Sequence, residues 1–167
     1  MKKLKRAVEA FLSGARCVGV LGVGSELRAD DAAGMLVAEL LDIYANRKTS
    51  RTKLGIFYGG TAPENLTGEI KRFAPTHLIV IDTADFGEKP GHVQMFDKEN
   101  VGNFSFSTHK LPIKVMIDYL LQSIDNMKVS IIGLQPKSLD FGKTPSEEVK
   151  TSVNDLASII EDVMEGR

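Results

Sequence analysis

Two aspartates and one histidine, far apart in the chain, combine side chains that can bind a metal ion: Asp31, Asp82 and His109. Two carboxylates and one imidazole suit a transition metal such as nickel, zinc, iron or manganese, and they leave positions open for water or a substrate. Spacing along the chain does not by itself establish such a site. The elements that would bring these residues together therefore have to be predicted.

The acidic residues also have purely structural interpretations. Asp30 or Asp31 could cap the helix predicted to follow, a role that contributes about 1 kcal/mol, although capping needs only one of them. Asp82 ends an apolar strand, where a carboxylate is either solvated at a turn or held over a site. Asp85 and Glu64 are typical of turns and helix starts. We expect Asp30 to serve the loop or cap, so that Asp30→Ala reduces processing less than Asp31→Ala, which should abolish it.

The three histidines differ in the positions that the predicted elements give them. His77 starts a strand at the opposite end of the sheet, and His92 lies early in a later strand. His109 lies in NFSFSTHKLP, just before a helix, and can therefore reach the acidic edge. The sequence contains no His-Glu-x-x-His, Cys-x-x-Cys, Gly-x-Ser-x-Gly or P-loop pattern, which removes the commoner peptidase, esterase and nucleotidase templates.

Predicted strands and helices alternate along the chain. The apolar runs CVGVLG, KLGIFYGG, HLIVIDTADFG, GHVQMFD and VSIIGLQP predict strands, and the segments between them have helical spacing. The connection GEKP is too short for a crossover helix, so GHVQMFD should run antiparallel. The pattern predicts an α/β fold with three layers, α/β/α, around a mostly parallel twisted sheet of about five strands. Ligands in such sheets bind beyond the carboxyl ends of the strands, where Asp31 and Asp82 fall.

The predicted helices have recognisable boundaries. The first amphipathic segment should end near Gly14 and pack on the sheet, and Pro63 should lie in the first turn of PENLTGEIKRFA. Ser146 is the expected N-cap of the last helix.

Composition limits the possible partners and compartment. The 167 residues suit one domain over 1–167, with 21 Lys and Arg against 22 Asp and Glu. This balance gives no basic field for nucleic acid or an anionic membrane. The single Cys17 cannot form an internal disulfide and is expected in the core, and the N-terminal segment is unlike a signal peptide, which predicts a cytoplasmic protein.

Five sequence blocks, taken in order, resemble the hydrogenase maturation endopeptidase family. The blocks are GVGSELRADDAAG, GGTAPEN, IVIDTADFG, STHKLPI and GLQP, and they span most of the chain. The doubled aspartate and STHKLP are most similar to the subgroup that processes formate-hydrogenlyase-type enzymes. Ser25 and Ala29 stand where the family often has Asn and Gly, so the loop conformation is the feature that these departures affect.

The resemblance implies a function and a set of site residues. The implied activity is that of a metal-dependent endopeptidase, which removes the C-terminal extension of a [NiFe] hydrogenase large-subunit precursor after nickel insertion. Asp31, Asp82 and His109 match the family's metal ligands. The nickel would come with the precursor, and the ion would polarise the scissile carbonyl or activate water. The identity of the general base stays open.

Two other functions fit some of the same residues. One is a small α/β nucleotide- or cofactor-binding module, with an anion at the helix that follows the glycine-rich loop. The glycines at 22 and 24 suit this weakly, because the third glycine of the dinucleotide fingerprint is missing and the neighbouring acidic residues would repel phosphate. The other is a non-catalytic nickel chaperone with the same three ligands.

Overall fold

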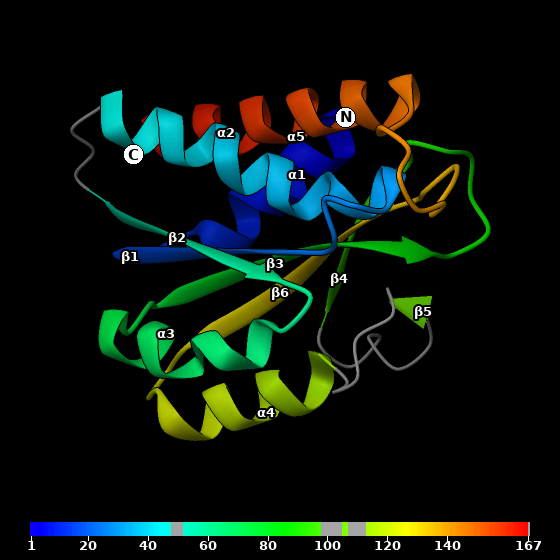
Figure 1. Cartoon of the computed structure of the whole chain (residues 1–167). Helices are drawn as coiled ribbons and strands as arrows, with labels where there is room; N and C mark the ends of the chain where they lie inside the picture. Colours follow the sequence, from blue (N-terminus) through cyan, green and yellow to red (C-terminus); the bar gives the residue numbers. More distant parts are fainter. Residues whose placement is uncertain (48–51, 98–104, 107–112, 167) are drawn as a thin grey trace.

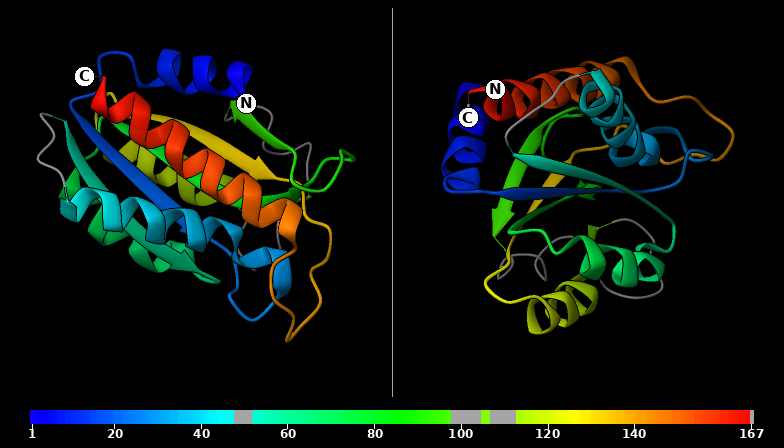
Figure 2. Two further views of the ribbon diagram at one scale, coloured as in Figure 1. Left: turned by 90° about the horizontal axis from the view of Figure 1, so that it is seen from above. Right: turned by 90° about the vertical axis from the view of Figure 1, so that its left-hand side faces the viewer.

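The computed structural model describes residues 1–47, 52–97, 105–106 and 113–166. A twisted sheet lies between two layers of helices (Figures 1 and 2). One face is covered by α1 (Lys2–Leu12), α2 (Ala33–Arg47) and α5 (Glu147–Glu165), and the other by α3 (Thr67–Phe73) and α4 (Ile113–Ser123). The predicted α/β class with three layers is confirmed. Within the described residues, no helix is long and apolar enough to cross a membrane.

Five strands lie in the order β2-β1-β3-β6-β4, and β5 pairs with the end of β3, giving six strands in all. The first four are parallel, and β4 is antiparallel to β6, as the short connection before it predicted. The strand bounds are β1 Cys17–Val23, β2 Lys53–Gly60, β3 His77–Asp85, β4 Val93–Asp97, β5 Ser105–Phe106 and β6 Lys128–Leu134.

Alternation along β3 sends neighbouring side chains to different layers of the fold. Ile79 and Ile81 pack in the core cluster that includes α1, α2 and α5. Leu78 and Val80 pack in the second cluster, with residues of α3 and α4. Continuing this period of two, Asp82 points toward the α3 and α4 layer and Thr83 toward α2. The end of β3 therefore presents polar groups to both layers.

Two of the predicted helix boundaries agree with the structure and one differs. Helix α1 ends at Leu12, with Ser13 as its C-cap, near Gly14 as predicted, and it packs against α5 as well as against β4. Pro63 does not begin α3. It begins a 3₁₀ turn, η2 (Pro63–Leu66), that leads into α3. Ser146 is the N-cap residue of α5, as predicted, but its hydroxyl bonds to Asp30 rather than to the helix.

Strands β1 and β3 diverge at their carboxyl ends. Their pairing runs to Gly22 opposite Ile81, after which Val23 pairs with Gly60 of β2. The N–H of Gly24 continues this shift by donating to the carbonyl of Gly60 at 2.9 Å. Helix α2 leaves β1 on one face of the sheet, and α3 precedes β3 on the other (Figure 1). This point is therefore the topological switch point, where open α/β sheets bind their ligands.

Candidate active site at the ends of β1 and β3

Helix α2 rests directly on the ends of the two diverging strands. A Cβ built on Gly34 would lie 2.3 Å from the carbonyl oxygens of both Ile81 and Val23, so only glycine fits there. Just before this contact, the 3₁₀ turn η1 (Ala29–Ala32) carries Asp31. The close approach of α2 thus places Asp31 over the switch point.

The loop before η1 is shaped by the same crowding. A Cβ on Gly24, which has φ +128°, would lie 1.8 Å from the carbonyl oxygen of Asp31. Ala29 adopts φ +42°, in the left-handed region where glycine has no steric cost. The family's usual glycine at this position is explained by this conformation, which the chain adopts with Ala29 in its place.

Asp31 is almost fully buried, and both of its oxygens accept hydrogen bonds. Its Oδ1 accepts from the Thr83 hydroxyl at 2.9 Å, and its Oδ2 accepts from the Ser25 N–H at 3.0 Å. A buried carboxylate requires such donors to offset its lost hydration. These bonds orient the Asp31 side chain, and they show that it does not serve mainly as a cap of the helix that follows.

Asp82 has no exposed surface, so the interpretation as a solvated turn residue is wrong. Its Oδ1 accepts from the backbone N–H of Thr83 at 2.8 Å. Thr83, which is itself buried, therefore donates to Asp31 through its side chain and to Asp82 through its backbone. Two of the three predicted site residues, Asp31 and Asp82, therefore accept hydrogen bonds from the same residue, Thr83.

His109 lies outside the described residues, so the complete ligand set stays a prediction. In the chain it precedes Ile113, the first residue of α4, and α4 belongs to the layer toward which Asp82 points. Among the residues that are described, no group of three or more His, Cys, Asp or Glu side chains could hold a metal ion. Asp31 and Asp82 supply carboxylate oxygens, a donor type that suits divalent metals.

Asp30 has a different role from its neighbour. It is fully buried, and its carboxylate accepts from the N–H groups of Lys137, Ser138 and Ser146 at 2.7, 3.0 and 2.6 Å, and from the Ser146 hydroxyl at 3.1 Å. Its own N–H donates to the carbonyl of Ser138. The predicted loop role of Asp30 is confirmed, but the loop that it holds is the distant one between β6 and α5.

Gln135, in the GLQP block, holds the loop that follows β3. Its Oε1 accepts from the N–H groups of Phe86 and Glu88, and its Nε2 donates to Asp85 at 3.1 Å. This bond from Gln135, with a second from the Gly87 N–H, holds the pKa of Asp85 below its usual value of 3.8. Asp85 is the last residue of β3, paired with Ser105 of β5, so the prediction of a turn or helix start at this position is wrong.

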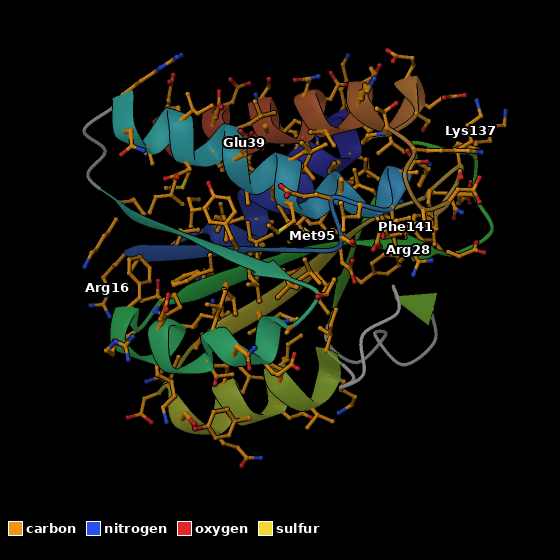
Figure 3. The ribbon with its side chains drawn as sticks, in the orientation of Figure 1. Arg16, Arg28, Glu39, Met95, Lys137 and Phe141 are labelled. Carbon is orange, nitrogen blue, oxygen red and sulfur yellow. The ribbon has the colours of Figure 1, made fainter. Side chains whose placement is uncertain are left out.

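The loops after β1 and β6 meet beside the buried aspartates. The Gly142 N–H donates to the Leu27 carbonyl at 2.8 Å, and the Arg28 Nε donates to the Leu139 carbonyl at 3.2 Å. Figure 3 labels Arg28 and Phe141 at this end of the sheet. Leu27 and Phe141 are 63% and 75% exposed, and we call these two side chains the apolar rim.

A doubly wound α/β sheet with two buried carboxylates at its switch point is the class of structure that this chain forms, and comparison with known proteins gives the family. The family profile described as hydrogenase maturation protease matches residues 35–163. A putative hydrogenase maturation protease of Methanocaldococcus jannaschii is 37% identical over 151 residues, which cover 86% of this chain and 88% of that protein. The hydrogenase 3 maturation protease of Escherichia coli is 30% identical over 146 residues, covering 85% and 87%. The chain belongs to the hydrogenase maturation protease family, as its sequence blocks predicted.

Solved structures agree with this assignment. The crystal structure of the [NiFe] hydrogenase maturation protease HycI from Thermococcus kodakarensis superposes with a TM-score of 0.84 and 29% identity, covering 95% of this chain and 99% of that one. The solution structure of the endopeptidase HycI from Escherichia coli gives a TM-score of 0.73 and 28% identity over 87% of this chain and 90% of that one. This chain is accordingly an endopeptidase.

Proposed function

We propose that this endopeptidase removes the C-terminal extension of a [NiFe] hydrogenase large-subunit precursor once nickel has been inserted, with Asp31, Asp82 and His109 engaging the nickel of the precursor. The observation that carries the proposal is the pair of buried carboxylates at the switch point, both bonded to Thr83. The substrate class follows from the family and from the names of the relatives.

The two carboxylates are suited to engage a substrate-borne cation. An ionised carboxylate offers about four lone-pair positions, and the hydrogen bonds from Ser25 and Thr83 use two of those on Asp31. Asp31 would engage the ion through the remaining positions. Nickel in the precursor supplies polarisation of the scissile carbonyl or of water. A carboxylate at the switch point then accepts the proton that water loses on attack.

The proposed ligand set also explains how the enzyme would choose its substrate. Two carboxylates and one imidazole do not form the closed set of four ligands found in structural metal sites. Such a set engages a loaded precursor more strongly than an empty one, and this difference in affinity is the specificity. Nickel insertion would therefore come before cleavage.

The apolar rim lies on two loops that hydrogen-bond to each other, and contact with another protein there would suit an endopeptidase and a nickel chaperone alike. Leu27 and Phe141 are its exposed side chains. The buried Asp31 and Asp82 disfavour a phosphate group at the same point. We also infer that residues 1–167 act as one domain in the cytoplasm, where the single Cys17 stays reduced.

The decisive experiment compares nickel-loaded and metal-free precursor, each incubated with chelator-treated enzyme, with shortening followed by mass spectrometry. We expect only the loaded precursor to be shortened, and Asp31→Asn or Asp82→Asn to abolish the reaction. Asp162→Asn is the matched control, because Asp162 lies in an exposed ion pair with Lys5. Efficient cleavage of metal-free precursor would refute the role of nickel. Nickel binding without shortening of either precursor would instead establish the chaperone alternative.

A further inference from the structure

Thr83 donates one hydrogen bond to Asp31 and another to Asp82. Its hydroxyl donates to Asp31 Oδ1 at 2.9 Å, and its backbone N–H donates to Asp82 Oδ1 at 2.8 Å. Its side chain is 1% exposed, so water does not compete for the hydroxyl. A single residue therefore fixes one oxygen of each carboxylate.

The strand geometry explains how Thr83 reaches two groups in different layers. The pairing of β3 with β1 ends at Ile81, whereas β3 remains paired with β6 as far as Thr83. On the β1 side of the strand, backbone groups beyond Ile81 can therefore bond to side chains. Alternation turns the Thr83 side chain toward α2, where the contacts of Gly34 hold the first turn against the strand ends. The β-branched side chain has a restricted χ1, which directs the hydroxyl at Asp31.

We propose that Thr83 is a positioning residue for the reaction, holding the Asp31 carboxylate in the orientation that engages the nickel of the precursor. The inference rests on the proposed function, since it gives Thr83 its role through Asp31. Polar groups that bond to a metal-binding side chain orient it, and removing them typically lowers metal affinity or activity by about 10-fold to 100-fold. The hydroxyl is the part that matters, because the bond to Asp82 comes from the backbone and survives substitution.

A purely structural role is the alternative, because any buried hydroxyl with a hydrogen bond contributes to stability. The chain offers a matched control for this alternative in the same sheet. Ser130 of β6 is also buried, and its hydroxyl donates to the Phe96 carbonyl at 3.1 Å. Ser130 pairs with Ile79, away from the switch point, so Ser130→Ala removes a comparable bond without touching the aspartates.

The experiment uses the full chain with Thr83→Val, Thr83→Ser or Ser130→Ala. For each variant it measures the thermal midpoint of unfolding and the kcat and KM on nickel-loaded precursor. It also compares binding of the variant to loaded and to metal-free precursor. Thr83→Val keeps the shape and loses the hydroxyl, so we expect kcat/KM to fall by about 10-fold to 100-fold. The preference for loaded over metal-free precursor should fall with it. Thr83→Ser should restore kcat/KM and the preference for loaded precursor. Ser130→Ala should lower the thermal midpoint but leave kcat/KM and that preference unchanged. Thr83→Ala replaces Thr83→Val in the test if the valine variant does not fold.

Any of four results would overturn the inference. The first three are trimming by Thr83→Val at the wild-type rate, failure of Thr83→Ser to restore the reaction, and an equal loss in Ser130→Ala. An unchanged preference for loaded precursor in a slow Thr83→Val variant would also overturn it, because the defect would then not lie in nickel engagement. If the wild-type chain trims neither precursor, the proposed function itself fails, and this is seen before any variant is made.

Discussion

Asp30 and Asp31 are adjacent in the chain and both are buried, but their hydrogen bonds go to different parts of the fold. Asp31 bonds to Ser25 and Thr83 at the switch point. Asp30 bonds to the segment that joins β6 to α5. The same residue type therefore serves the proposed chemistry at one position and the loop scaffold at the next.

This difference leads to a prediction about stability. Asp30→Ala removes the acceptor of four hydrogen bonds, and we expect it to lower the free energy of unfolding by about 4 kcal/mol. This is the low end for four unpaired donors at about 1 to 3 kcal/mol each, because the donors are only partly buried. Urea denaturation measures this loss. The milder effect that the sequence suggested for Asp30 concerned processing of the precursor, and a trimming assay of the folded variant tests it separately.

Asp31→Asn is the matched comparison for that experiment. It keeps the shape of the side chain and one acceptor, so its unfolding free energy should change less than that of Asp30→Ala, while trimming is lost. Equal stability of the two variants would contradict the scaffold role assigned to Asp30.

At this scale the sequence was informative about positions and not about bonds. Asp31 and Asp82 could be placed at strand ends because apolar runs stop just before them. The bonds of Thr83 could not be predicted, because they depend on how closely α2 approaches the strands. The partners of Asp30 lie 107 to 116 residues away, a separation that no local pattern encodes.

Among the elements, the first turn of α2 is the one whose placement determines the site. Gly34→Ala would push a methyl group into the carbonyl oxygens of Ile81 and Val23. We expect a loss of about 2 to 3 kcal/mol in unfolding free energy, typical of severe overpacking, together with weaker trimming as Asp31 moves away from Thr83. Thermal denaturation and the trimming rate of the folded variant check this.

The matched control is Gly68→Ala in α3. The nearest neighbour of a Cβ there is the guanidinium of Arg72 at 3.7 Å, so the methyl group fits. Alanine is the better helix former, by about 1 kcal/mol in a helix interior, and this variant should keep or gain stability. Equal destabilisation of both variants would contradict the direct contact of α2 with the strands.

The elements themselves were largely predictable, but two of their starts were not. The segment PENLTGEIKRFA has the composition of one helix, yet Pro63–Leu66 forms a 3₁₀ turn before α3. A 3₁₀ turn differs from an α-helix in one step of hydrogen bonding, and tertiary contacts decide between them. Tertiary contacts also decide the conformation of η1, whose residues Asp30 and Asp31 bond to distant parts of the chain.

At the scale of the whole molecule, three exposed carboxylates in the described part of the chain have pKa values held below their usual range. Gln135 lowers the pKa of Asp85, Lys143 lowers that of Asp140, and Lys137 lowers that of Glu148, mainly through hydrogen bonds. All three belong to, or bond to, the loops that follow β3 and β6. The stability of these loops therefore depends on the protonation of the three carboxylates.

The sign of this dependence follows from the direction of the shifts. A carboxylate with a lowered pKa binds fewer protons in the folded state, so its contribution is complete above the usual values of 3.8 for Asp and 4.5 for Glu. It is lost as the pH falls through the lowered pKa values. We expect unfolding free energy to be nearly constant from pH 7 to 5 and to decline below pH 4, as urea denaturation would measure. Asp85→Asn should flatten part of this decline, and an unchanged slope would contradict the assignment.

The fold class followed from the alternation of strands and helices, but the order of the strands did not. The antiparallel direction of β4 was predicted from its short connection, whereas its place beside β6 rather than β3 was not. A short apolar strand can pair with any exposed edge. Its partner is chosen by packing between segments distant in sequence, here including α1, which contacts β4.

The bonds of Asp30 also set an order of events during translation. Its donors at Lys137, Ser138 and Ser146 leave the ribosome long after η1 has been made. Contacts of such separation form late, because a long chain must close before they are gained. A nascent or prematurely terminated chain that ends before Ser146 lacks two of the four donors of this carboxylate, so the turn that carries Asp31 is held by fewer hydrogen bonds. The full set of bonds around Asp30 therefore forms only when synthesis of the chain is nearly finished.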